Sequence, residues 1–361
     1  MESAMLENCV SDHFFRQLSS SNVRISLRVI SLVLLLMPAA AGAVDEQWFS
    51  FRNHNPFLQI YGLPPFQTAT RVTDGESNYN ISLDIANHAD SDATSNESAL
   101  IDGESYFFTY SVRHGLTPWL EVGLDLPLVA HANGVFDNLI ERWHKILGVS
   151  NSNRSGPANQ LHFSFDSSRA APYELTSSTI GLGDIQVTAA VPLWEAREPN
   201  RRVVTLRSSL KLPTGDAATL RGSGAIDASL GLYASDMSTF AKHNVSLTGF
   251  GGILFLGSGD VLPEIQKNTV GFGGVAATWQ LTERLDLTTQ LYAQSAYFDS
   301  ELSILGDSSL QVAFGGIYRW PKHRLSLSFA VVEDVFADAT TDVALHLAVR
   351  TSGAKLDGGP P

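Results

Sequence analysis

Charged side chains recur at alternate positions within otherwise apolar segments of this sequence. In the stretch LTPWLEVGLDLPLV, Glu121 and Asp125 alternate with Leu120, Val122 and Leu124. Successive side chains of an extended strand point to opposite faces, so the acids share one face and the aliphatic residues the other. The same alternation predicts one charged face for Glu121, Asp125, Asp184, Arg207, Lys211, Asp227, Arg284, Asp286 and Arg319. Charges of both signs on one face favour ion pairing, or contact with a polar solute, over a strongly selective ion pore.

The sequence carries no local signature of a catalytic centre. The patterns G-x-S-x-G, H-E-x-x-H and the Walker loop do not occur. Asp90 with Asp92, and Asp260 with Glu264, lack the spacing of a calcium loop. We therefore predict no catalytic residue, no metal site and no cofactor, and we expect that the protein is not an enzyme. A Ser/His site assembled from separate strands would leave no local signature, which keeps a hydrolase as a less favoured alternative.

Residues 1–43 have the pattern of a secretory signal peptide. Arg24 and Arg28 precede the short apolar run Val29 to Met37, and Ala41 to Ala43 supplies the small residues of a cleavage site. The run is shorter than the roughly 20 apolar residues that a membrane helix needs. We predict cleavage after Ala43, with a buried helix or a retained anchor as the alternative. The length of this region leaves the true start codon open.

Charge and cysteine content narrow the class of partner. The chain has a formal net charge of −13, and residues 1–43 contain equal numbers of Arg and acidic residues, so the mature chain keeps that charge. An acidic surface repels nucleic acid, and we expect no nucleic acid partner. The single cysteine, Cys9, lies in the predicted signal peptide. The mature chain then has no disulfide and no thiolate metal site.

After residue 76 the chain repeats alternating segments of about ten residues, the length of a tilted strand that crosses a bilayer. The segments are 78–86, 104–113, 119–129, 180–193, 202–212, 225–233, 244–255, 269–281, 284–293, 310–320, 324–332 and 342–350. Bacterial barrels have an even number of strands. We predict an all-β fold: an antiparallel transmembrane β-barrel of about twelve strands over residues 77–350, with the outer membrane of a Gram-negative bacterium as its location.

Link lengths alternate along these segments. Short links occur at 115–118, 195–200, 236–242, 282–283 and 321–322, and mostly longer ones at 87–103, 130–179, 213–224, 256–267 and 298–309. Outer-membrane barrels have short periplasmic turns and long extracellular loops, which matches this pattern. Trp119, Trp194, Trp279 and Trp320 all lie beside short links. Because tryptophan favours the membrane interface, we predict that these four form a girdle at one rim.

Four further segments lie outside the predicted strands. Residues 44–76, which contain NPFLQIYGLPP, are predicted to lie under the barrel in the periplasm or to enter its lumen as a plug. Within the stretch GVFDNLIERWHKILGV, residues 136–148 have apolar side chains at helical spacing. This spacing predicts one short helix in the longest loop. Residues 161–167 are either a loop hairpin or a membrane strand. Residues 351–361 form a tail.

Two stretches carry a family resemblance: NPFLQIYGLPP, and LTPWLEVGLDLPLVAHANGVFDNLIERWHKILGV with the downstream Asn153 and Arg154. Together they resemble an uncharacterised bacterial outer-membrane family known only as a domain of unknown function. The resemblance extends over most of the mature chain. It implies an outer-membrane barrel and transfers no catalytic residue. One departure is the end of the chain, LDGGPP, where barrels of this class often end on an aromatic residue read by the assembly machinery.

These observations lead to ranked functional hypotheses. The first is a passive channel or binding protein for a small solute, hydrophobic compounds included, in which a narrow bore, luminal charges and a loop lid select by size and polarity. The second is a structural or adhesive barrel with a blocked lumen that acts through its outer loops, and the third is an outer-membrane lipid hydrolase. Expected partners are outer-membrane lipids, the barrel-assembly machinery and an unknown small solute. The oligomeric state and the identity of the solute stay open.

Overall fold

The computed structural model describes residues 48–134, 160–196, 201–336, 339–341 and 343–352. All of them belong to the second of two units, Ala40–Pro361, and only this unit is described. Its strands are β1 (Ser77–Ala93), β2 (Glu97–Thr117), β3 (Leu120–Ala132), β4 (His162–Ser167), β5 (Tyr173–Leu175), β6 (Thr179–Leu182), β7 (Gln186–Ala196), β8 (Arg202–Lys211), β9 (Asp227–Asp236), β10 (Val245–Phe255), β11 (Thr269–Gln280), β12 (Leu285–Gln294), β13 (Ser309–Trp320), β14 (Leu325–Phe336) and β15 (Val343–Ser352). Its helical turns are η1 (Ala217–Thr219), η2 (Ala241–His243), α4 (Ser303–Gly306) and η3 (Pro321–His323).

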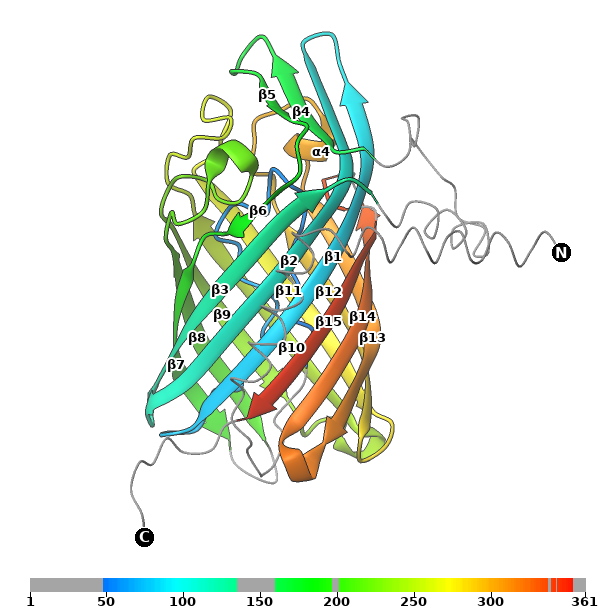
Figure 1. Ribbon diagram of the computed structural model, residues 1–361. Coiled ribbons are helices and arrows are strands. Elements are labelled where there is room, and N and C mark those ends of the chain that lie inside the picture. The colour runs from blue at the N-terminus through cyan, green and yellow to red at the C-terminus, as the bar shows by residue number, and fades with distance from the viewer. Residues whose placement is uncertain (1–47, 135–159, 197–200, 337–338, 342, 353–361) are drawn as a thin grey trace, which may run out of the picture. The chain divides into compact units, whose positions relative to one another are not determined.

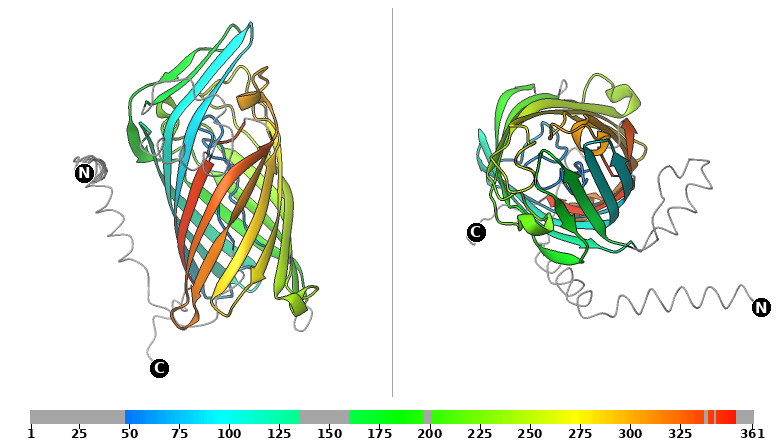
Figure 2. Two further views of the ribbon diagram at one scale, coloured as in Figure 1. Left: turned by 90° about the vertical axis from the view of Figure 1, so that its right-hand side faces the viewer. Right: turned by 90° about the horizontal axis from the view of Figure 1, so that it is seen from above.

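Within the described residues, 12 strands close into an antiparallel barrel (Figure 1). Neighbours in sequence pair along β7 to β15, β1 pairs with both β2 and β15, and β3 pairs with β2 and β7. Seen from above, these strands form a ring (Figure 2, right). The predicted fold, an antiparallel barrel of about twelve strands, is confirmed. One segment differs, because residues 183–185 interrupt the predicted strand 180–193 and leave β6 and β7, which both pair with β3.

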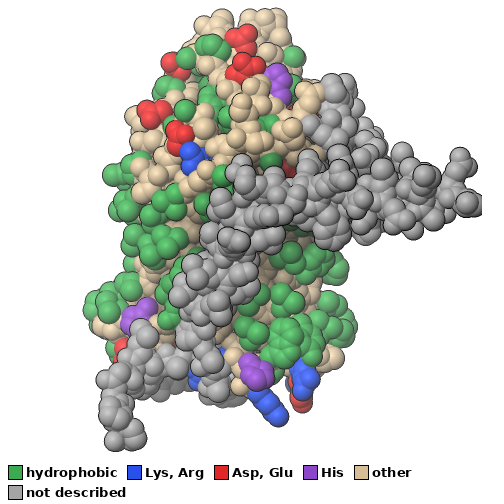
Figure 3. Space-filling view, in the orientation of Figure 1, with side chains coloured by type: hydrophobic (Ala, Val, Ile, Leu, Met, Phe, Trp, Pro, Cys, Tyr) green, Lys and Arg blue, Asp and Glu red, His purple; other side chains and the backbone are tan. Residues whose placement is uncertain are grey.

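The alternation of side chains separates an apolar outer face from a polar inner face. Leu83 of β1 lies in register between Leu347 and Phe108, whereas the adjacent Ser82 lies between Ala348 and Thr109. The exposed large apolar residues on the strands include Leu124, Val187, Leu210, Leu230, Leu232, Ile253, Val275, Leu291, Phe314, Leu327, Phe329 and Leu347. Hydrophobic side chains cover much of the middle of the wall, with acids toward the upper end and basic side chains at the lower end (Figure 3).

The two rims of the barrel differ in their connections. Short links at 118–119, 237–244, 281–284 and 321–324, with the partly described link after β7, make up what we call the short-turn rim. Longer links at 212–226, 256–268 and 295–308 lie at the opposite, long-loop rim. Trp119, Trp194 and Trp279 are exposed beside short links, and Trp320 is half-buried against Tyr318.

The first link of the long-loop rim is an extension of the barrel wall. The sequence predicted a long loop at 87–103, but β1 and β2 stay paired in register as far as Ala93 and Ser98. The hairpin therefore projects past the rim (Figure 1). In the same region β4 pairs with β2 and with β5, so residues 161–167 contribute to a loop hairpin and add no strand to the barrel.

Several predicted features lie outside the described residues. They are the signal peptide, the helix at 136–148 and the tail after Ser352, where β15 ends. Within the described residues, no helix combines the length and apolar character needed to cross a membrane.

Candidate functional site

Residues 48–72 run inside the barrel, and we call them the luminal segment. Trp48 at its start contacts Arg350 at the end of β15, and Val72 at its end donates its amide to Glu121 of β3. Between these points the chain turns back on itself, since the amide of Phe66 donates to the carbonyl of Phe51 at 2.8 Å. The segment thus enters and leaves near the short-turn rim, and its tip reaches toward the long-loop rim (Figure 2, drawn in blue).

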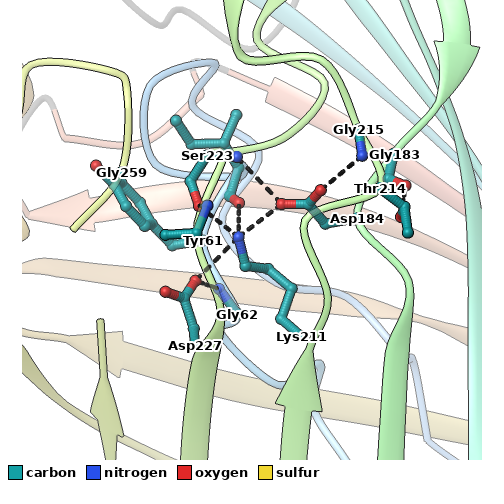
Figure 4. A network of polar contacts seen from close by, with 12 residues as sticks. Tyr61, Gly62, Gly183, Asp184, Lys211, Thr214, Gly215, Ser223, Asp227 and Gly259 are labelled. Atoms are coloured by element: carbon teal, nitrogen blue, oxygen red, sulfur yellow. Dashed lines mark hydrogen bonds and ion pairs between the residues drawn. The ribbon is translucent and has the colours of Figure 1, made fainter. Parts of the chain in front are cut away.

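A buried lysine fixes the tip of the luminal segment to the wall (Figure 4). Lys211 Nζ lies 2.6 Å from Asp184 Oδ2 and 3.2 Å from Asp227 Oδ2, with 1% of its side chain exposed. It also donates to the carbonyl oxygen of Ile60, at 3.2 Å, and to the hydroxyl of Ser223. One cation therefore pairs with two carboxylates and also binds the segment. We call this group the lysine anchor.

The two carboxylates of the lysine anchor also accept backbone hydrogen bonds. Asp227 Oδ2 accepts from the amide of Gly62 at 2.8 Å, and Asp184 Oδ1 accepts from the amide of Gly215 at 2.7 Å. A Cβ added at Gly62 would lie 2.9 Å from the Cβ of Asp227 and 3.1 Å from that of Lys211. Glycine is therefore the residue that lets the backbone approach the wall at this point.

A second ion pair, the arginine anchor, holds the returning half of the luminal segment. Arg207 donates to the carbonyls of Thr68 and Thr70 at 3.0 and 2.7 Å, and to Glu121 Oε1 at 2.7 Å. The other oxygen of Glu121 accepts from the amide of Val72, also at 2.7 Å. Charge-assisted hydrogen bonds to backbone groups thus bind a segment that has no strand partner of its own.

Strand register brings these charges together. Glu121 of β3 and Arg207 of β8 both pair with Ala190 on the intervening β7, and this small side chain leaves space for the guanidinium to cross. Lys211 pairs in register with Asp227 on β9. Arg113 and Asp125 form a bidentate pair with both distances at 2.8 Å.

Beyond β9, the strands β10 and β12 contact the luminal segment mainly through aromatic rings. Phe66 lies edge-on to Phe250 and Tyr292, with ring centroids 4.9 and 6.4 Å apart, and Phe51 lies edge-on to Tyr292 at 6.0 Å. Gln290 of β12 pairs with the backbone of Phe49 as a strand would, accepting from its amide at 2.7 Å and donating to its carbonyl at 3.1 Å. The segment is therefore held by charges on β3, β8 and β9 and packed against aromatic rings of β10 and β12.

Outer connections close over the tip of the luminal segment. Asn53 donates to the carbonyl of Ala339, and Asn55 donates to that of Ile304, at 2.7 and 3.1 Å. Gln59 donates to the carbonyl of Leu220 in the connection between β8 and β9.

An acid orders the connection that carries Leu220. The hydroxyl of Thr219 donates to the carboxylate of Asp216 at 2.7 Å, and this hydrogen bond lowers the pKa of Asp216 below its ordinary value. Asp216 therefore stays ionised and pairs with Arg221 at 3.1 Å. This rigid connection places the Leu220 carbonyl and the Ser223 hydroxyl in the lumen.

Small cavities lie between the luminal segment and the polar wall, three of them lined by described residues. Their volumes are about 70, 40 and 10 Å³. The first, which we call the arginine cavity, is lined by Arg71, Arg113, Arg207 and Arg350, and the second, the aspartate cavity, by Asp84, Asp125 and Asp184. Ser50, Pro65 and Ser111 line both, so the two adjoin. A water needs about 10–15 Å³ of such volume, so each of the two larger cavities holds a few waters.

Histidines lie between the aspartate cavity and the long-loop rim. Ser105 Oγ lies 2.8 Å from His131 Nδ1 and 2.9 Å from His88 Nε2, and His131 Nε2 lies 3.2 Å from the Leu220 carbonyl. His131 therefore donates to Leu220 and accepts the Ser105 proton. A carbonyl stands where a catalytic triad has a carboxylate, all three side chains are buried, and none lines the three cavities.

The structure places the predicted charged residues as follows. Glu121, Asp125, Asp184, Arg207, Lys211, Asp227 and Asp286 are buried on the inner side, and Arg319 pairs with Asp286 at 2.9 Å. Arg284 is different: it lies beyond the end of β12 in a short link and is exposed, because the strand begins only at Leu285. Asp184 also lies outside a strand, in the interruption between β6 and β7.

Sequence reasoning missed a second group of inner residues. Asp84 Oδ1 lies 2.7 Å from His346 Nδ1 and 3.6 Å from His54 Nε2, which joins β1, β15 and the luminal segment. The alternation within β1 already placed Asp84 on the polar face, and that was the available signal. Within the described residues, no group of acidic, histidine or cysteine side chains is arranged to hold a metal ion.

The sequence matches the family described as Protein of unknown function (DUF3187) over residues 24–352. The chain belongs to this family. No curated protein matches it. Among solved structures the chain is similar to the COG4313 outer membrane channel from Pseudomonas putida F1, with 11% identity, a TM-score of 0.50, and coverage of 82% of this chain and 98% of that chain. At this identity the likeness shows the fold alone.

Another similar structure is the Ralstonia pickettii toluene transporter TbuX, at 10% identity and a TM-score of 0.36, covering 78% of this chain and 90% of that chain. A score this low carries no argument for function. The functional case therefore has to be made from the lumen itself.

Proposed function

We propose that this protein is an outer-membrane barrel that passes a small solute and that is described here in a closed state. The observation that carries the proposal is the polar space that remains between the luminal segment and part of the wall. The segment is packed against β10 and β12. Toward β1 and β2 it makes a few direct contacts, at Asp84 and Phe107 among others, and two adjoining polar cavities lie beside these contacts. A segment designed only to fill a barrel would leave no such row of polar space.

The wall supports a location in a bilayer. Exposed aliphatic and aromatic side chains occupy the outer positions of the strands, and exposed tryptophans follow the short-turn rim. In water this much exposed apolar surface would cause association, whereas lipid chains cover it without cost. The short-turn rim then faces the periplasm.

An arginine placed on the outer face tests this location. Val275 lies near the middle of β11 and is 55% exposed. In phospholipid vesicles, Val275→Arg is expected to lower the free energy of unfolding by about 2–4 kcal/mol, measured by urea titration. The matched control, Leu281→Arg in a short link, should lower it by at most about 1 kcal/mol, because the rim is hydrated. Equal effects at both positions would contradict the proposal that lipid chains surround the outer face of the barrel.

A reversible crosslink tests whether the luminal segment closes the pore. The amide nitrogen of Ala69 lies 3.1 Å from Ser235 Oγ of β9, so cysteines at these positions are within reach of each other. The mature chain is expected to contain no native cysteine. In liposomes loaded with small solutes, the oxidised double variant Ala69→Cys/Ser235→Cys should release none, and reduction should restore release to the wild-type rate.

The single variants Ala69→Cys and Ser235→Cys serve as controls for oxidation. Release that is equal in oxidised and reduced protein would show that the luminal segment does not gate the pore. If liposomes that contain the wild-type protein release no small solute, the channel function is rejected, but the barrel fold is not affected.

The filled lumen also favours a second function, a structural or adhesive barrel that acts through its outer surface. The hairpin of β1 and β2, extended by β4 and β5, provides such a surface. Binding to cells that is lost when this projecting region is shortened, with no solute release before or after, would favour this second function. We regard the protein as a non-enzyme in either case.

A further inference from the structure

Strand side chains hold the returning half of the luminal segment mainly by its backbone. At Ala69, Thr205 of β8 donates to the carbonyl at 2.6 Å, and Ser235 of β9 accepts from the amide at 3.1 Å. At Thr68, Arg207 donates to the carbonyl at 3.0 Å, whereas the buried side-chain hydroxyl has no hydrogen-bond partner among the described residues. Strand side chains also bond main-chain groups of Ile60, Gly62, Pro64, Thr70 and Val72. The wall therefore recognises a peptide main chain here more than a particular sequence.

The hydrogen-bonding groups of the wall match both halves of a peptide group. Lys211 and Arg207 donate to carbonyls of the segment, and Asp227 accepts from an amide (Figure 4). A peptide group carries one acceptor and, except at proline, one donor. The side chain of Gln290 matches both at once, because its oxygen accepts from the amide of Phe49 and its nitrogen donates to the carbonyl of the same residue. Main-chain hydrogen bonds of this kind give affinity for extended peptides.

The charged groups that bond the backbone also have partners on the wall itself. Arg207 pairs with Glu121 at 2.7 Å. Lys211 pairs with Asp184 and Asp227 at 2.6 and 3.2 Å. If the luminal segment is displaced, these charges keep their partners, so the surface is not left with isolated buried charge. The same donors and acceptors are then available to a second main chain.

One side-chain pocket accompanies the backbone contacts. The ring of Phe66 lies edge-on to the rings of Phe250 and Tyr292, with centroids 4.9 and 6.4 Å apart. Tyr233 stacks on Phe250 at 4.7 Å and extends the pocket toward β9. Aromatic rings gain from burial and from edge-to-face contact in such a pocket. In extended-peptide recognition, pockets of this kind give the preference for one side chain.

We propose that the inner wall is a binding surface for an extended oligopeptide with an aromatic side chain, and that such a peptide is the solute. In the closed state the luminal segment occupies this surface in place of the peptide. The inference deepens the proposed function and rests on it for transport, but binding itself needs no open pore.

Fluorescence anisotropy tests the binding surface, with a labelled peptide of the sequence of residues 60–72 as the probe. In the wild type the luminal segment competes as a tethered ligand, at an effective concentration on the order of mM. In Gly62→Leu this segment no longer fits, because a Cβ would already lie 2.9 Å from the Cβ of Asp227. The full mature chain with Gly62→Leu, in detergent, should bind the probe at least about tenfold more tightly than the wild type does.

Modified peptides separate recognition of the main chain from recognition of side chains. N-methyl groups at Gly62 and Val72 remove the two N–H groups that carboxylates accept, and should weaken binding by about tenfold or more. The control is an N-methyl group at Gln67, whose amide has no hydrogen-bond partner among the described residues. This control peptide and a Thr68→Ala peptide should bind like the probe, whereas a Phe66→Ala peptide should bind about tenfold more weakly.

Wall variants locate the bound peptide. Combined with Gly62→Leu, Thr205→Val removes the hydroxyl that bonds the Ala69 carbonyl and should weaken probe binding by about threefold or more. The matched control is Thr288→Val, because Thr288 is a buried threonine whose hydroxyl bonds Thr278 on the neighbouring strand. It should bind the probe like Gly62→Leu alone. A shift in gel mobility on heating should be checked for every variant, so that loss of binding is not loss of the fold.

Release from liposomes tests transport by the wild type and needs no substitution. The probes are a tetrapeptide that contains one phenylalanine and a trisaccharide of similar mass. The tetrapeptide should leave at least about tenfold faster than the trisaccharide, because the donors and acceptors of the lumen match its main chain. Liposomes without the protein give the rate of leakage for each probe.

The outcomes separate the peptide from the channel. Equal binding of the probe and of the peptide methylated at Gly62 and Val72 overturns the proposal. So does the absence of probe binding by Gly62→Leu when added protease cleaves its residues 48–72. If this variant resists the protease, the release assay decides: a tetrapeptide that leaves no faster than the trisaccharide rejects the peptide as the solute and keeps the channel. Probe binding without release of either compound keeps the binding surface and rejects the channel.

Discussion

Lys211→Met is expected to lower the free energy of unfolding by about 3–5 kcal/mol, the cost of leaving buried charge unpaired. The lysine is the cation between Asp184 and Asp227, at 2.6 and 3.2 Å, and methionine keeps its length without its charge. Both carboxylates would then face each other and the Ile60 carbonyl in a site closed to solvent. Urea titration of the barrel refolded into vesicles measures the change.

An exposed ion pair provides the control for this prediction. Arg202 pairs with Asp236 at 2.9 Å, and 45% of its side chain is exposed. Arg202→Met should therefore cost less than about 1 kcal/mol. Adding Asp227→Asn to Lys211→Met should recover part of the loss, because one of the two unpaired charges disappears. If Lys211→Met costs no more than Arg202→Met, water reaches the two carboxylates and the lysine anchor is not closed.

Gly62→Leu is expected to raise the rate of solute release from liposomes by about tenfold. A Cβ at this position would lie 2.9 Å from the Cβ of Asp227, and the remaining leucine atoms have no space between the segment and the wall. Overpacking of this kind costs about 1–3 kcal/mol. The cost applies only while the luminal segment lies against the wall, so it destabilises the closed state alone. The same variant should expose residues 48–72 to added protease.

Gly271→Leu is the matched glycine substitution. A Cβ there meets no atom nearer than Ser295 Oγ at 4.0 Å, and the residue is exposed on β11. It should leave both solute release and protease sensitivity as in the wild type. If Gly62→Leu also leaves release unchanged while residues 48–72 become cleavable, the segment moves without opening a path and the gate lies elsewhere.

Much of the architecture could be predicted from the sequence, because a barrel wall imposes its rule residue by residue. Each strand has lipid on one side and the lumen on the other, so Leu83 and Asp84 show their faces in the local pattern alone. Arg284 was placed on the inner face because the same alternation extends back from Leu285, the first residue of β12, into the short link before it. Local periodicity does not mark where a strand stops.

The sequence by itself determined the twelve alternating segments, the two kinds of link and the polarity of each face, since these depend on neighbours along the chain. Tertiary structure alone decided which charges meet. Arg207 reaches Glu121 because the strand register sets both opposite the small Ala190. Lys211 joins two acids because the register sets it opposite Asp227 and the interruption between β6 and β7 places Asp184 beside it. The place of residues 48–72 also follows from the closed ring, because several strands at once supply partners on their inner surfaces for the backbone groups of this segment.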